Sequence, residues 1–102
     1  MNDMDKIDIT IRMLDLDGAR LSLAEQRLRH MLKERDIQAD IICVSCGLEI
    51  ARQGFSNGLP ALLMNQYLAS EGRELTEEVL EEFCGKLELW ISRVRARQAG
   101  ES

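Results

Sequence analysis

Apolar and polar side chains alternate near the start of the chain. Every second residue from Ile7 to Met13 is apolar, and Asp8, Thr10 and Arg12 stand between them. A period of two residues turns one set of side chains to each face of a β-strand. The pattern therefore predicts a first strand over residues 7–13.

A helical period follows. The apolar positions recur three or four residues apart, at Leu21, Ala24, Leu28, Met31 and Leu32. This spacing places them on one face of a helix. Ser22 and Glu25 have the spacing of a capping box, in which each side chain satisfies a free backbone amide of the first turn. We therefore expect a helix that begins near Ser22 and ends near Arg35.

Residues 39–44 are almost continuously apolar. Such a short run is typical of a central strand that is buried on both faces. Ser45 then stands where it would cap a short helix, which would carry Cys46 in its first turn and stop at Gly54.

Two later apolar segments, residues 61–65 and 67–70, are too close together for a crossover connection and predict a hairpin. Pro60 stands just before them. Proline has no amide hydrogen, so it belongs at the first residue of a strand rather than inside one. A long helix is expected to follow from about Glu77, with Thr76 as its cap.

The apolar face of this long helix consists of Val79, Leu80, Phe83, Leu87, Trp90, Ile91 and Val94. It continues beyond the expected edge of the domain. A large apolar side chain left in water forgoes about 1.5–3 kcal/mol of burial free energy. We therefore expect Trp90 and Ile91 either to fold back over the sheet or to bind a protein partner, of which a homodimer is one form.

Composition supports one compact domain over residues 1–98, with a frayed tail over residues 99–102. The net charge of −5 argues against nucleic acid as a partner, because phosphate binding needs a concentrated basic surface. The basic cluster Arg93, Arg95 and Arg97 falls at a helix end, where cations are favourable. No apolar run reaches the roughly 20 residues of a membrane span, and the acidic N-terminus is unlike a secretory signal. We expect a cytoplasmic protein without a membrane partner.

The predicted order β-α-β-α-β-β-α, with Leu59-Pro60 before the third strand, resembles the thioredoxin-like superfamily over roughly residues 7–87. The resemblance implies an α/β fold, with a four-stranded mixed sheet flanked by helices. It also implies a cis Leu59–Pro60 bond beside the redox site, which makes both residues candidates for binding. In the superfamily a Cys-x-x-Cys follows the first strand, whereas this chain has Asp17-Gly18-Ala19-Arg20 there. Ordinary thioredoxin catalysis is therefore not expected.

Cys43 and Cys46 form a Cys-x-x-Cys elsewhere in the chain, too close to Pro60 to be the superfamily motif. They follow a strand whose end lies at the sheet edge where α/β proteins place ligand sites. A helix start lowers the pKa of a thiol. The pair is thus a candidate redox centre of an atypical thiol-disulfide oxidoreductase or a thiol-based sensor. The alternative is packing as small hydrophobes, which we also expect for Cys84.

No metal and no cofactor are expected. A closed tetrahedral site needs four nitrogen or sulfur ligands, and apart from two neighbouring thiols the chain offers a distant Cys84 and His30. Asp15 and Asp17 lie in a turn but lack the spacing of a calcium loop. The sequence favours a protein-binding or self-associating accessory domain over a thiol enzyme.

Overall fold

The computed structural model describes residues 8–55 and 58–100. Its elements are β1 (Thr10–Leu14), α1 (Gly18–Glu34), β2 (Asp40–Val44), α2 (Gly47–Arg52), β3 (Ala61–Met64), β4 (Tyr67–Glu71) and α3 (Glu77–Gly100). The predicted α/β order and the long C-terminal helix are confirmed. Ile7, which the alternating pattern placed in the first strand, lies outside the described residues.

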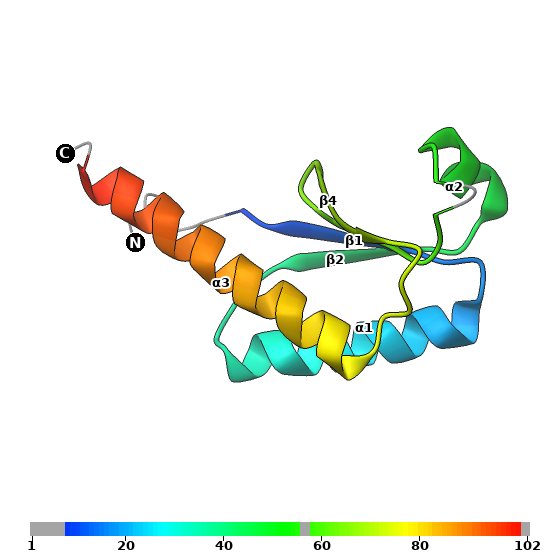
Figure 1. Ribbon diagram of the computed structural model, residues 1–102, viewed down its shortest axis with the longest axis horizontal. Helices are drawn as coiled ribbons and strands as arrows, with labels where there is room; N and C mark the ends of the chain where they lie inside the picture. The colour runs from blue at the N-terminus through cyan, green and yellow to red at the C-terminus, as the bar shows by residue number, and fades with distance from the viewer. Residues whose placement is uncertain (1–7, 56–57, 101–102) are drawn as a thin grey trace.

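The four strands form one mixed sheet in the order β2-β1-β3-β4. β1 runs parallel to β2 and antiparallel to β3, and β3 and β4 form the predicted hairpin. Figure 1 shows α1 and α3 on one side of the sheet and α2 on the other, near the ends of β1 and β2. The prediction that residues 39–44 form a central strand is wrong. β3 pairs on the far side of β1, so β2 stays at an edge and leaves Ile42 44% exposed.

Most of the buried side chains lie between the sheet and the pair α1 and α3. This main core includes Ile9, just before β1, and Ile11 and Met13 of β1, together with the apolar faces of both helices. A much smaller α2 cluster lies on the opposite face and contains Leu14, Ile50, Ala61 and Leu63. The two faces of the sheet are therefore covered very unequally.

The helix starts correct two of the predicted caps. α1 begins at Gly18 rather than near Ser22, because the Asp17 carboxylate accepts a hydrogen bond from the Arg20 amide at 3.1 Å. α2 begins at Gly47 with Cys46 as its N-cap residue, and no side chain caps it. The expected Ser45 cap is therefore wrong, and Cys46 precedes the helix instead of lying in its first turn.

The start of α3 agrees with the prediction. Thr76 Oγ1 accepts a hydrogen bond from the Val79 amide at 3.3 Å, and the helix then runs without a break to Gly100. Leu87 and Ile91 are buried in the main core, whereas Trp90 is only partly buried against it. The C-terminal half of α3 reaches beyond the end of α1 (Figure 1). None of the helices in the described ranges combines the length and the hydropathy of a membrane span.

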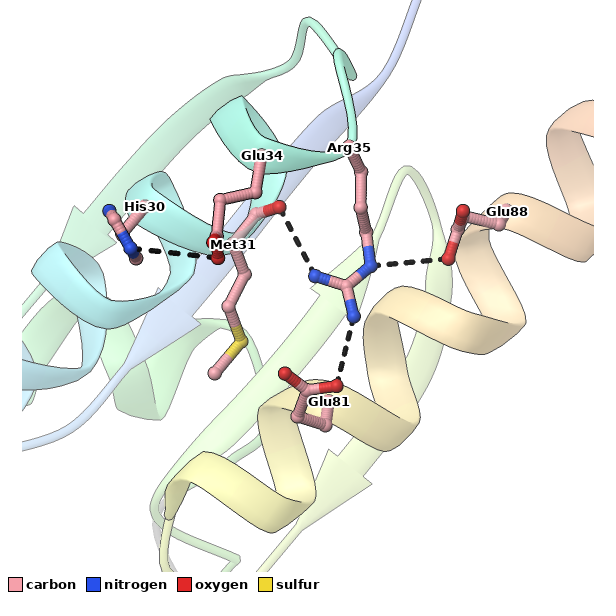
Figure 2. Close-up of polar contacts among 6 residues, drawn as sticks. All are labelled: His30, Met31, Glu34, Arg35, Glu81 and Glu88. Carbon is pink, nitrogen blue, oxygen red and sulfur yellow. Dashed lines mark hydrogen bonds and ion pairs between the residues drawn. The ribbon is translucent and has the colours of Figure 1, made fainter.

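Arg35, the C-cap residue of α1, joins the two large helices (Figure 2). Its Nη2 lies 2.9 Å from Glu81 and its Nε 3.1 Å from Glu88, both on α3. Its Nη1 donates to the Met31 carbonyl at 3.3 Å. The guanidinium thereby holds the end of α1 against one flank of α3.

Candidate functional site

The carboxyl ends of β1 and β2 meet the start of β3 at one end of the sheet. The Asp15 amide continues the parallel ladder by donating to the Val44 carbonyl at 3.1 Å. On the other side of β1, Leu14 pairs with Ala61. The antiparallel register therefore sets Pro60 across from Asp15. Pro60 is buried, and the Leu59–Pro60 bond is cis, as expected.

Asp15 is buried in an ion pair. Only 1% of the residue is exposed, and its two carboxylate oxygens lie 2.6 Å from Nε and 2.7 Å from Nη2 of Arg20. These bidentate hydrogen bonds lower the pKa of Asp15 and outweigh the opposing effect of burial. Because Arg20 occupies both oxygens, the carboxylate is not free to bind a cation. The described ranges also contain no group of three or more acidic, His or Cys residues placed to hold a metal.

Two apolar side chains at this end of the sheet are exposed to solvent. Leu16 is 59% exposed and Leu48 is 64% exposed. The two belong to neighbouring segments, because a Cβ added at Gly47 would lie 3.4 Å from Cδ2 of Leu16. We call the region that contains these two leucines, the partly buried Leu59 and the buried Pro60 the Pro60 edge. Contiguous exposed apolar patches mark interaction sites on soluble proteins, which makes these neighbouring leucines a candidate for one.

The structure places the two candidate redox thiols in different surroundings. Cys46 is exposed, just before α2. Cys43 lies on β2 and packs against the main core, on the side of the sheet that α1 covers. Burial raises the pKa of Cys43 to about 11, and the nearby Glu25 carboxylate adds to the increase. Both thiols are free, and a redox role for the pair stays a prediction.

The remaining candidate residues are Cys84, His30, Trp90 and Ile91, and their packing and exposure indicate no chemical site. Cys84 is fully buried in the main core, as expected for a packing residue, and burial raises the pKa of its thiol. His30 is exposed on α1 and lies 3.5 Å from Glu34 (Figure 2). Ile91 is packed within its own chain, which leaves Trp90 as the more accessible of the two predicted binding residues.

Two features of the Pro60 edge were missed from the sequence. The Asp15–Arg20 pair joins a turn residue to one that stands just before the predicted helix, although an acid and an arginine five positions apart across a helix start are a usable signal. The exposure of Leu16 also had a signal, since a leucine between Asp15 and Asp17 lies outside both neighbouring periodic patterns.

A groove of about 660 Å³ lies at the opposite end of the sheet, between Ile9, the segment 35–40 and α3. Its lining includes Arg35 and Glu88, which are already paired with each other. The charges of Arg35 and Glu88 therefore satisfy each other and are not available to bind a ligand in the groove. Comparison with protein-family models, with curated proteins and with solved structures finds no match for this chain.

Proposed function

We propose that this protein is a thioredoxin-like module that lacks ordinary thioredoxin catalysis and binds a polypeptide partner through the Pro60 edge. The element order supports the proposal, since a parallel β-α-β unit is followed by a hairpin on the same sheet, with Pro60 just before β3. These are the features on which the resemblance to the thioredoxin-like superfamily depends.

The observation that carries the proposal is the Asp15–Arg20 ion pair. It occupies the junction of the first strand and first helix, where the superfamily has its two thiols. A buried carboxylate held by two hydrogen bonds cannot exchange disulfides. The residues at this junction lie beside Pro60 but include no thiol, which is the group that the superfamily uses for catalysis. The arrangement therefore favours binding over catalysis.

The surface beside the ion pair suits a polypeptide. Leu16, in the segment after β1, and Leu48, in the first turn of α2, expose apolar side chains, and Leu59 is partly buried against the α2 cluster. An extended peptide can cover such side chains with its own apolar residues, while its backbone remains hydrogen-bonded or solvated. Each large side chain that becomes fully buried contributes about 1.5–3 kcal/mol.

The binding test uses peptides of roughly ten residues selected from a random library on the immobilised wild type. We expect Leu48→Glu to weaken their binding at least about tenfold, because it places a charge in the apolar contact. Leu23→Glu is the matched control, since Leu23 is also exposed but lies on α1. Peptides that bind wild type and Leu48→Glu equally well would refute the Pro60 edge as the binding surface.

The alternative function is an atypical thiol-disulfide oxidoreductase or thiol-based sensor that uses Cys46 with Cys43. The observation in its favour is that Cys46 is exposed beside the Pro60 edge. Insulin reduction with dithiothreitol as the electron donor separates the two functions. We expect no turnover above the dithiothreitol background, and turnover that disappears in Cys46→Ser would favour the oxidoreductase instead.

A further inference from the structure

We infer that the outer face of α3 packs antiparallel against α3 of a second copy of this chain. Glu78, Glu82, Gly85, Leu89 and Arg93 recur at intervals of three and four residues, so they share one face of the helix. All five are exposed. The flank of α3 that carries Glu81 and Glu88 is already held by Arg35 (Figure 2). The face described here is therefore a separate surface.

Two residues on this outer face are unexplained by contacts within the chain. Leu89 is 53% exposed in the middle of α3. Gly85, one turn earlier, destabilises a helix relative to alanine, yet an added Cβ would meet nothing within 4 Å. Glycine permits another backbone to approach closely. A second helix that seats a leucine over Gly85 would account for both residues.

The charges along α3 indicate which molecule supplies that second helix. Glu77, Glu78, Glu81 and Glu82 lie in its first two turns, and Arg93, Arg95 and Arg97 lie near its end. Among the ion pairs of the described residues, none involves these three arginines. An identical helix in the opposite direction has the complementary order of charges, whereas a parallel copy would set like charges together.

In a two-fold symmetric pair, every contact between two residues occurs twice, once in each direction. One such contact therefore fixes the register of the two helices. With Leu89 of one copy over Gly85 of the other, Glu82 comes opposite Arg93 of the second copy. Glu82 has a contact within its own chain, to Arg73 at 3.5 Å, but both side chains are more than half exposed. That solvated contact leaves the carboxylate available to a second partner. Trp90 is partly buried against the core of its own chain and lies outside this face.

The test is sedimentation equilibrium from low to high micromolar concentration. We expect the wild type to dimerise and Leu89→Glu to be monomeric. Glu82→Arg and Arg93→Glu should each weaken the dimer about tenfold, since each replaces two attractive contacts by two repulsive ones. The double variant Glu82→Arg/Arg93→Glu should restore it. Leu23→Glu on α1 is the matched control and should dimerise like the wild type.

A wild type that stays monomeric at high micromolar concentration overturns the inference. A dimer that persists in Leu89→Glu but dissociates in Trp90→Ala also overturns it, because the contact then lies on the other side of the helix. Circular dichroism of each variant distinguishes a lost contact from a lost fold. The inference is independent of the Pro60 edge, and selected peptides should bind Leu89→Glu as well as they bind the wild type.

Discussion

At the scale of single residues, the Asp15–Arg20 pair has a measurable consequence for stability. Arg20→Met leaves a buried carboxylate without its main partner, and we expect a loss of about 2 kcal/mol in the free energy of unfolding near pH 7. Arg29→Met is the matched control. It removes an exposed pair with Glu25 on the same helix and should cost less than about 0.5 kcal/mol.

The pH dependence of this loss follows from the lowered pKa of Asp15 in the folded protein. A carboxyl group with a lowered folded pKa stabilises the protein above its unfolded pKa, and that contribution disappears as the pH falls through the folded value. The difference between wild type and Arg20→Met should therefore be largest near neutral pH and shrink below about pH 4. Urea unfolding of wild type and Arg20→Met, near neutral pH and again below about pH 4, measures this difference in stability. Equal losses in Arg20→Met and Arg29→Met near pH 7 would contradict the structural role of the pair.

The three thiols should react with iodoacetamide in the order of their exposure. We expect Cys46 to be modified first in the native protein, Cys43 more slowly and Cys84 last. Because the pKa of Cys43 is raised to about 11, its rate should increase about tenfold for each pH unit between pH 8 and pH 10. Peptide mapping after timed modification measures the order, with urea-denatured protein as the control. Faster native modification of Cys84 than of Cys46 would contradict it.

At the scale of helices and strands, the sequence predicts what depends on local periodicity. The apolar faces of α1 and α3 and the alternation in β1 are properties of consecutive residues, and the structure confirms them. The position of β2 is different, because pairing across the sheet decides which strand is central. An apolar run such as residues 39–44 is therefore compatible with either position. The pairing of β3 beside β1 determines the outcome.

Helix caps and the candidate site were harder to predict for a related reason. Asp17 and Ser22 are both good N-cap residues, and the choice between them depends on where β1 ends and how the chain turns into α1. Pro60 was placed correctly before a strand because its missing amide is a local property. The Asp15–Arg20 pair is local in the sequence, but its burial depends on how the sheet end packs around it. The nearness of Leu16 to Gly47 depends on how two separate segments meet, and local patterns do not encode that.

At the scale of the whole molecule, the unequal cover of the two sheet faces predicts unequal local stability. α1 and α3 contribute most of the buried residues of the main core, whereas α2 buries only Ile50 among its own residues. Segments with few buried apolar contacts open locally at lower free energy than the core. We therefore expect α2 to open while β1, β3 and α3 stay folded.

Amide hydrogen exchange followed by mass spectrometry measures this difference. Peptides that cover 47–52 should exchange before those that cover 80–91, which includes the buried face of α3. Ile50→Ala should accelerate exchange in α2 while the core of α3 stays protected, because Ile50 anchors α2 to the small cluster with Leu14 and Leu63. Exchange of α2 at the same rate as α3 in the wild type would show that the molecule opens only as a unit. Local opening of α2 would also move Leu48, and with it the Pro60 edge, so a bound peptide should slow exchange there first.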